Sequence, residues 1–394
     1  MRKNVLLAAI LLLSASANGI AQDKQPEGYV FTSIKEIPTT SIKNQYRSGT
    51  CWSFSGVGFF ETELLRMGKP EVDLSPMFVV RMAYADKAEK YVRMHGALNF
   101  GGGGSFYDVW DVMKRYGIVP MEVYQGLNYG EEKHVHGELD ALTEAYVKAM
   151  VKNPNRKLSS AWLKGFNGIM DAYLGAVPEN FTYKGKSYTP KSFAESLGLK
   201  LDDYVCISSY THHPFYTEFI IEVPDNWQLA TVHNVPMHEM MQIIDNAIDN
   251  GYPIAWASDV SEGGFSWRHG VAIVPDMESQ ELQGSDMARW TKMTAQEKNE
   301  KAFEKPGKEL TITQEMRQAE FDNFQTTDDH GMVLVGAAKD QEGNIYYKVK
   351  NSWGVDGKYN GYFYASKAFV QYKTMSIMVH KDAIPKAIRQ KMKL

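Results

Sequence analysis

The sequence predicts an α+β protein with a helical first half and a sheet-rich second half. Between residues 51 and 174, apolar side chains recur at helical spacing in several successive segments. After residue 270, short runs of β-branched and aromatic residues are bounded by Gly, Asp and Asn, which is typical of strands. A helical unit beside a sheet-rich unit leaves a cleft between two lobes, where active sites commonly lie.

Length and composition narrow the class of protein. A chain of 394 residues exceeds the roughly 250 to 300 residues at which a single core stops growing, so we expect two lobes or a core with large insertions. With 44% hydrophobic and 23% charged residues, general disorder is excluded. Two cysteines are too few for a disulfide scaffold, and a net charge of −4 without a long basic run is untypical of a nucleic-acid binder.

The first 21 residues have the pattern of a secretory signal peptide. Arg2 and Lys3 precede the apolar run 5–13, and small residues lead to a cleavage site after Ala21. The run is much shorter than the roughly 20 residues of a membrane span, and no cysteine follows it to carry a lipid. We therefore expect a periplasmic or secreted protein without a membrane anchor. The alternative is an apolar N-terminus that stays in the cytosol.

The first long helix is predicted from Cys51 to Met67, because its apolar residues follow helical spacing and Gly68 stands where such a helix would end. Ser75 and Pro76 mark the start of a second helix, with proline in the first turn. Further helices are predicted after the glycine run 101–104, at residues 139–151 and at residues 160–174.

Strands are predicted later in the chain, at residues 271–274, 332–335, 345–349 and 362–364. The charged segment 276–326 lies between them, contains a capped helix at residues 311–320 and is expected to leave the sheet. The resulting division is a signal peptide (1–21), a helical lobe with Cys51 (22–130), a helical insertion (131–213) and a β-rich lobe (214–394).

Cys51 opens the first predicted helix and is the candidate nucleophile. The aligned dipoles and unpaired N–H groups of a helix N-terminus lower the pKa of a thiol, and the thiolate is the attacking form. Gln45 lies shortly before it, so its side-chain amide can curl back beside the thiol. Together with the Cys51 N–H, this amide would donate hydrogen bonds to the oxyanion of an attacked carbonyl group.

A cysteine nucleophile needs a base, and the base needs a group that orients it. His330 begins one predicted strand and Asn351 follows the next, so adjacent strands can bring the two side chains together. We expect the Asn351 amide oxygen to accept a hydrogen bond from His330 Nδ1, which leaves Nε2 for the thiol. Trp353 can shield this hydrogen bond from water.

The type, order and spacing of these residues resemble the papain-like cysteine peptidases. The motifs are Gln45, Ser48-Gly49-Thr50-Cys51-Trp52-Ser53-Phe54, Asp329-His330-Gly331 and Lys350-Asn351-Ser352-Trp353-Gly354. Further segments look like the bleomycin hydrolase and aminopeptidase C branch: Leu74-Ser75-Pro76, Gly103-Gly104-Ser105-Phe106-Tyr107-Asp108 and Tyr116-Gly117-Ile118-Val119-Pro120. The resemblance runs from about residue 30 to about residue 388.

The resemblance implies a papain-like, two-lobed fold with helical insertions, and a peptidase that acts on peptides and needs no cofactor. By position, Cys51, His330 and Asn351 would be the nucleophile, the base and the orienting residue, and Gln45 would help to form the oxyanion hole. The branch forms hexameric rings with inward-facing sites, which implies a homo-hexamer.

Gly103 and Gly104 are implied to bind substrate. A backbone without side chains lets an extended peptide approach and form hydrogen bonds with it, as an added strand would. The alternative is that the glycine run 101–104 is a flexible loop.

Three features depart from the resembled families. Secreted papain-like enzymes usually have a cysteine where this chain has Ser48, so that disulfide cannot form here. The branch ends in an arm whose terminal carboxylate receives the amino group of the substrate, and only residues 387–394 follow the segment that looks like its base. The branch is also cytosolic, whereas this chain begins with a signal. Exopeptidase and endopeptidase cleavage both stay open.

The remaining chemistry-bearing residues have plainer interpretations. Cys206, flanked by Val205 and Ile207, is expected to pack in the core. The histidine pairs have no convincing ligand spacing, so no metal site is predicted; these are His134 with His136, His212 with His213, and His233 with His238.

The leading hypothesis is a secreted, aminopeptidase-like cysteine peptidase. The alternatives are a catalytically idle peptide-binding or scaffold protein with the same fold, and acyl transfer or deamidation by the same cysteine chemistry.

Overall fold

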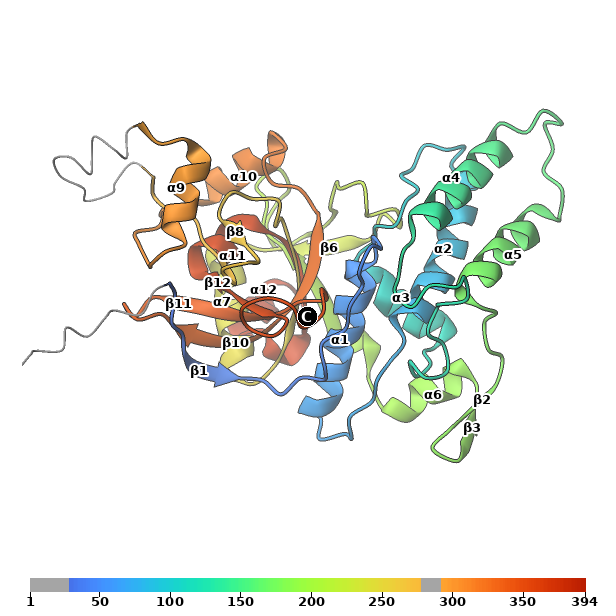
Figure 1. Cartoon of the computed structure of the whole chain (residues 1–394), viewed down its shortest axis with the longest axis horizontal. Coiled ribbons are helices and arrows are strands. Elements are labelled where there is room, and N and C mark those ends of the chain that lie inside the picture. Colours follow the sequence, from blue (N-terminus) through green and yellow to red (C-terminus); the bar gives the residue numbers. More distant parts are fainter. Residues whose placement is uncertain (1–27, 278–291) are drawn as a thin grey trace, which may run out of the picture.

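The computed structural model describes residues 28–277 and 292–394, so the predicted signal peptide lies outside the described part of the chain. Figure 1 shows helices on one side, a large sheet with its own helices on the other, and helix α1 (Cys51–Arg66) between them. The prediction of an α+β protein with two lobes is confirmed. Within the described ranges, no helix is long and apolar enough to cross a membrane.

The helical lobe follows the sequence prediction closely. Its elements are α2 (Pro76–Arg93), α3 (Phe106–Tyr116), α4 (Gly137–Val151), α5 (Trp162–Leu174), the hairpin β2 (Phe181–Tyr183) and β3 (Lys186–Tyr188), and α6 (Pro190–Leu197). Side chains cap three of these helices: Ser75 accepts a hydrogen bond from the Phe78 N–H, Ser105 and Asp108 form a capping box at the start of α3, and Thr189 accepts a hydrogen bond from the Ser192 N–H at the start of α6.

The second lobe is built on one large, mostly antiparallel sheet. Its strands are β1 (Thr32–Glu36), β4 (Tyr204–Ser208), β5 (Glu218–Ile220), β6 (Thr231–Asn234), β7 (Ile254–Ser258), β8 (Phe265–Ser266), β9 (Val271–Ala272), β10 (His330–Lys339), β11 (Ile345–Lys350), β12 (Tyr362–Ser366) and β13 (Thr374–His380). Their order is β5-β6-β4-β13-β7-β10-β11-β12-β9-β8, and β1 pairs with β10. β10 is therefore an interior strand.

Helices and short 3₁₀ turns cover this sheet and its ends. They are η1 (Leu201–Asp203), α7 (Met237–Asp249), α9 (Ala295–Ala302), α10 (Gln314–Asp322), α11 (Lys367–Lys373), η2 (Lys381–Ala383) and α12 (Lys386–Lys391). The capped helix predicted at 311–320 is α10, and Thr313 caps it by accepting a hydrogen bond from the Met316 N–H.

The main sheet recruits two strands from segments predicted to be helical. β1 comes from the 22–130 segment and β4 from the 131–213 segment. β1 has a weak strand pattern, since it is mostly exposed and polar, whereas β4 is a five-residue run of mainly aromatic and β-branched residues within a segment of helices. Pairing with long central strands stabilises both, and the proposed division into lobes and insertion stays a prediction.

Helix α1 is the shared core of the two lobes. Its side chains are buried from Trp52 to Leu64 with almost no exposed face. Small residues allow the close packing: a Cβ on Gly56 would lie 2.7 Å from the Val109 side chain of α3. On the sheet side, a Cβ on Gly331 of β10 would lie 2.7 Å from Ser55 Oγ. The two glycines therefore bring α1 tightly against both lobes.

Candidate active site

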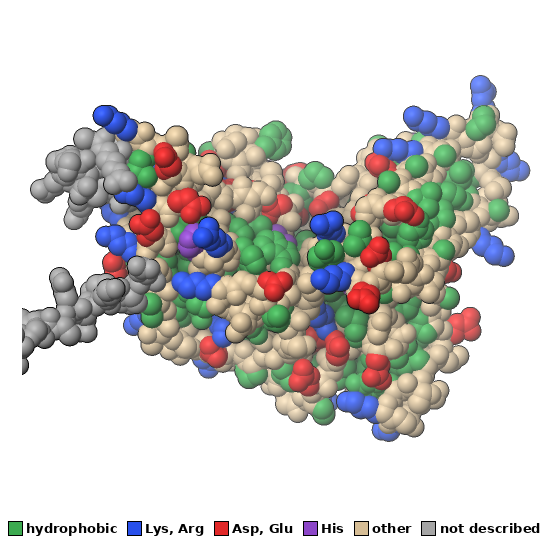
Figure 2. All heavy atoms as spheres, in the orientation of Figure 1, with side chains coloured by type: hydrophobic (Ala, Val, Ile, Leu, Met, Phe, Trp, Pro, Cys, Tyr) green, Lys and Arg blue, Asp and Glu red, His purple; other side chains and the backbone are tan. Residues whose placement is uncertain are grey.

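Cys51 lies at the first position of α1, half-buried at the boundary between the lobes. In the space-filling view the outline of the molecule dips between the two lobes (Figure 2), on the side where α1 begins. The backbone N–H groups of Gly331 and Trp52 form hydrogen bonds with its thiol. Since Gly331 directly follows His330, the fold brings the thiol to the strand that carries the predicted base.

His330 and Asn351 meet as the sequence predicts, but through the other ring nitrogen. His330 Nε2 lies 2.7 Å from Asn351 Oδ1, and both side chains are buried. The expected use of Nδ1 for this bond is therefore wrong, because the ring at the start of β10 directs Nε2 toward the end of β11. With Nε2 engaged, Nδ1 is the nitrogen left to exchange a proton with the thiol.

Trp353 and Gln45 surround this pair. The Trp353 ring stacks on the imidazole, with ring centroids 4.6 Å apart and an interplanar angle of 28°. Gln45 is held at both ends of its amide: Nε2 donates to the Ser48 carbonyl at 2.9 Å, and Oε1 accepts from Ser352 Oγ at 2.7 Å. One Gln45 N–H remains for another acceptor, beside the loop that leads into Cys51.

Burial disfavours the charged form of both reactive groups. Burial raises the pKa of the Cys51 thiol to about 12, and hydrogen bonds from Gly331 and Trp52 lower it only in part. Burial also lowers the pKa of His330 to about 4, although its bond to Asn351 acts in the opposite direction. The N–H groups at the start of α1 lower the thiol pKa as expected, but desolvation is larger, so the net shift is upward. Transfer of the thiol proton to the imidazole would form the two charges together as a pair.

A pocket of about 680 Å³ lies beside Cys51 and receives side chains from both lobes. His330 lines it from the sheet lobe, while Gly104 and Phe106 line it from the helical lobe. Cys206 of β4 lines the same pocket, and it packs against the core with part of its surface toward the cavity. Both thiols are free, so no disulfide joins them.

The two glycines predicted to bind substrate occupy different environments. Gly104 lines the pocket, and a Cβ there would lie 2.8 Å from the Trp52 ring. The Gly103 carbonyl accepts a hydrogen bond from Lys87, and a Cβ on Gly103 would lie 1.9 Å from the Asp225 carboxylate. Their role in substrate binding stays a prediction, with Gly104 the one that faces the cavity.

Two acidic residues of the pocket were missed by the sequence analysis. Asp225 and Asp328 both line the cavity beside Cys51. The only available signal for Asp328 was its position two residues before His330. Asp225 lies in a segment without a motif, and only the three-dimensional fold brings it to the cleft.

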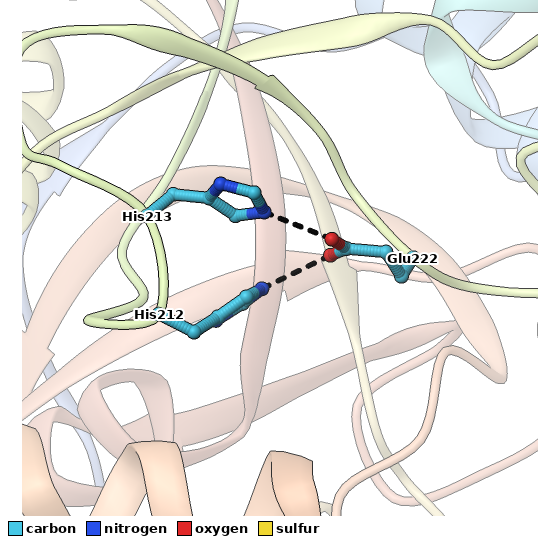
Figure 3. A group of neighbouring side chains, drawn as sticks. All are labelled: His212, His213 and Glu222. Atoms are coloured by element: carbon cyan, nitrogen blue, oxygen red, sulfur yellow. Dashed lines mark hydrogen bonds and ion pairs between the residues drawn. The ribbon is translucent and has the colours of Figure 1, made fainter.

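Among the described residues, His212, His213 and Glu222 form the group whose donor atoms are spaced as metal ligands would be, all within 4.8 Å of one another. Figure 3 shows both rings directed at the carboxylate: the two Nε2 atoms lie 3.0 and 2.8 Å from its two oxygens. Sequence spacing missed the group because Glu222 lies after β5, away from the histidine pair. It lies outside the pocket, its members bond to one another, and the expectation of no metal stays a prediction.

Comparisons with known proteins agree with this geometry. A model of the papain family of cysteine proteases matches residues 30–228, and a model of a peptidase C1-like family matches residues 282–394. The chain is 23% identical to aminopeptidase C of Streptococcus thermophilus, over 88% of this chain and 82% of that protein. It is 24% identical to aminopeptidase C of Listeria monocytogenes, over 90% of this chain and 83% of that protein.

The fold comparison points the same way. The crystal structure of PepW from Lactobacillus rhamnosis matches with a TM-score of 0.69 at 19% identity, over 92% of this chain and 84% of that chain. At this identity the match establishes the fold. Together with the family model that covers half of the sequence, it shows that the chain belongs to the papain family of cysteine proteases and is a cysteine peptidase of the aminopeptidase C type.

Proposed function

We propose that the protein is a secreted, aminopeptidase-like peptidase that hydrolyses peptide bonds with Cys51 as nucleophile, His330 as base and Asn351 as orienting residue. The observation that carries the proposal is the 2.7 Å bond between His330 Nε2 and Asn351 Oδ1, beside a thiol that accepts a hydrogen bond from Gly331. The names of the related aminopeptidases support the substrate class.

In the first half of the reaction, His330 Nδ1 takes the proton of the Cys51 thiol while the sulfur attacks the peptide carbonyl carbon. The oxyanion accepts hydrogen bonds from the Cys51 N–H, which as the first helical residue has no acceptor within the helix, and from Gln45 Nε2. The imidazolium then protonates the amine as the C–N bond breaks.

In the second half, a water molecule attacks the thioester. His330 takes a proton from this water, and the oxyanion uses the same two donors. The C–S bond breaks, the acid leaves, and the proton returns to Cys51. The bond to Asn351 keeps the ring in one orientation through both halves.

Hydrolysis of small peptide amides tests the proposal. Cys51→Ala and His330→Ala should each abolish turnover, whereas His238→Ala should keep it within about threefold and serves as the matched control for His330; Cys206→Ala, which alters the pocket lining but not the proposed chemistry, should retain turnover. Circular dichroism checks that all four variants fold. Turnover that survives in Cys51→Ala or His330→Ala would exclude this chemistry.

Secretion is tested separately. The mature protein should begin at Gln22 and be recovered from the periplasm or the medium, as N-terminal sequencing of the purified protein would show. A full-length chain in the cytosol would refute it. The hexamer implied by the resemblance also stays a prediction, and light scattering of the mature protein measures it directly.

A further inference from the structure

The ten-residue loop between β5 and β6, residues 221–230, has a fixed shape. Asn226 is buried at its base, and its amide nitrogen donates to the carbonyls of Ile221 and Ala230, each at 3.0 Å. Asn226 Oδ1 accepts from the Ala230 N–H at 2.9 Å. A single side chain therefore closes the loop on itself.

This loop begins in the sheet lobe and docks on the helical lobe. Trp227 Nε1 and Gln228 Nε2 donate to the two oxygens of Asp108 in α3, at 3.1 and 2.8 Å. Lys90 of α2 donates to the Gln228 carbonyl at 2.5 Å. Trp227 and Asp108 are both buried. The loop thus connects the two lobes: its ends belong to β5 and β6 of the sheet lobe, and its tip forms hydrogen bonds with α2 and α3 of the helical lobe.

The 221–230 loop forms the wall of the pocket near the glycine run 101–104. Val223, Asp225 and Asn226 of the loop line the cavity beside Cys51. The Asp225 carboxylate lies directly over Gly103, where it accepts a hydrogen bond from Asn99 at 3.1 Å. A peptide that extends from the thiol along Gly104 toward Gly103 therefore approaches the Asp225 carboxylate.

The charge at this end of the pocket selects which chain end fits. Asp225 comes from the loop and Asp328 from the segment before β10, and the negative charge of Asp225 disfavours ionisation of Asp328. Burial raises the pKa of Asp328 to about 7 and also raises that of Asp225. Asp259 and Asp329 add further negative charge toward Asp328.

One nearby cation offsets part of this charge. Lys87 acts electrostatically on Asp225 and lowers its pKa, but its ammonium group forms its hydrogen bonds with the carbonyls of Gly101 and Gly103 and not with the Asp225 carboxylate. Among the described residues, none forms a hydrogen bond or an ion pair with the Asp328 carboxylate. An ammonium group of a ligand would supply the missing positive charge, whereas a carboxylate would be repelled.

We propose that the 221–230 loop closes one end of the substrate pocket and that Asp225 and Asp328 receive the α-ammonium group of the substrate there. The enzyme then cleaves close to free N-termini and rejects chains that continue past Gly103. This inference rests on the proposed peptidase function and adds to it the residues that determine specificity.

The experiment compares fluorogenic peptide amides of one sequence with a free and with an acetylated N-terminus. The wild type should favour the free form by at least about 100-fold in kcat/KM. Asp225→Asn and Asp328→Asn should each reduce this ratio at least about tenfold, mainly through KM for the free form. Glu222→Gln is the matched control, because it removes a carboxylate from the same loop but from the side that faces His212 and His213 (Figure 3).

A third substrate separates the two sources of an ammonium group. It is acetylated at the N-terminus and carries lysine in place of a neutral side chain. If it is cleaved as well as the free form, the pocket receives a side-chain ammonium and the assignment to the α-amino group is overturned.

Equal cleavage of the free and acetylated forms by the wild type, or a ratio unchanged in both aspartate variants, would also overturn the inference while the peptidase function stands. The absence of all turnover and of Cys51 alkylation in the wild type would instead refute both. Alkylation of Cys51 at least as fast as in the wild type shows for each variant that the rest of the site is intact, and either aspartate variant suffices if the other does not fold.

Discussion

Cys51 and Cys206 line the same pocket, yet they have opposite surroundings. Cys51 begins a helix, its thiol accepts N–H hydrogen bonds from Gly331 and Trp52, and the residue before Gly331 is a histidine held by Asn351. Cys206 lies in the middle of β4, opposite Met378 of β13. Burial raises the pKa of each thiol to about 12.

The comparison teaches that burial and exposure to the cavity do not make a cysteine a nucleophile. The difference is a proton acceptor in a fixed orientation and N–H donors that favour the anion. Cys206 has neither, and the negative charge of Asp108 disfavours its thiolate further. The pKa of the thiol taken alone therefore does not distinguish the two cysteines, because the proposed catalytic step transfers the proton within the Cys51–His330 pair.

Alkylation gives the largest expected contrast between the two thiols. At pH 6, iodoacetamide should modify Cys51 about 1000-fold faster than Cys206, because only Cys51 can lose its proton to a neighbouring imidazole. Peptide mapping by mass spectrometry measures both rates in one sample. In His330→Ala the rate at Cys51 should fall to that of Cys206. Equal rates in the wild type would break the comparison and favour the idle, peptide-binding alternative.

Gln45 tests a second feature that Cys51 has and Cys206 lacks, a side-chain donor to the oxyanion. Gln45→Ala should lower kcat about 100-fold, because one of two donors to the oxyanion is lost, while alkylation of Cys51 stays near the wild-type rate. Steady-state kinetics and the alkylation rate separate the two effects. Gln341→Ala, which changes an exposed glutamine in the turn between β10 and β11, is the control. A fall in alkylation equal to the fall in kcat would show that Gln45 positions the thiol instead.

Asn351 tests whether orientation of the base distinguishes Cys51 from Cys206. Asn351→Ala should lower kcat about 10- to 100-fold and leave KM close to the wild-type value, because His330 loses its 2.7 Å partner but remains under Trp353. Asn250→Ala, an exposed residue after α7, should change neither constant. An unchanged kcat in Asn351→Ala would mean that stacking alone fixes the ring.

The smallest expected effects are those of Asp328, on the melting temperature and on the alkylation rates of the two thiols. Its folded pKa of about 7 lies above the ordinary value of 3.8, so ionisation as the pH rises from 4 to 7 destabilises the folded state. Asp328→Asn should therefore raise the melting temperature by about 2 to 6 °C at pH 8 and leave it unchanged at pH 4. It should also speed alkylation of Cys51 more than that of Cys206, because Asp328 acts electrostatically on Cys51. A lower melting temperature at pH 8 would contradict this account.

Local patterns made much of the helical lobe predictable from sequence. The first helix ends at Arg66, one residue before its predicted end, because a continuous apolar run and the following glycine are local signals. Cys51, His330 and Asn351 could be paired in advance because each stands next to a recognisable motif.

Features that depend on distant contacts could not be predicted. Burial of Cys51 depends on both lobes, so its raised pKa is not encoded in the helix N-terminus. Which ring nitrogen of His330 forms the hydrogen bond with Asn351 depends on how β10 and β11 lie relative to each other. The docking of Trp227 joins it to Asp108, 119 residues earlier in the sequence, and no local pattern in the 221–230 loop signals that contact.

The position of β10 has a consequence for how the enzyme comes into being. Thiol and imidazole are translated at opposite ends of the polypeptide, and the strand with the imidazole also pairs with β1, β7 and β11. A nascent chain that has not yet reached β10 holds a cysteine without its proton acceptor. In the proposed mechanism, proteolytic activity therefore requires that β10 has been synthesised and has paired with these strands.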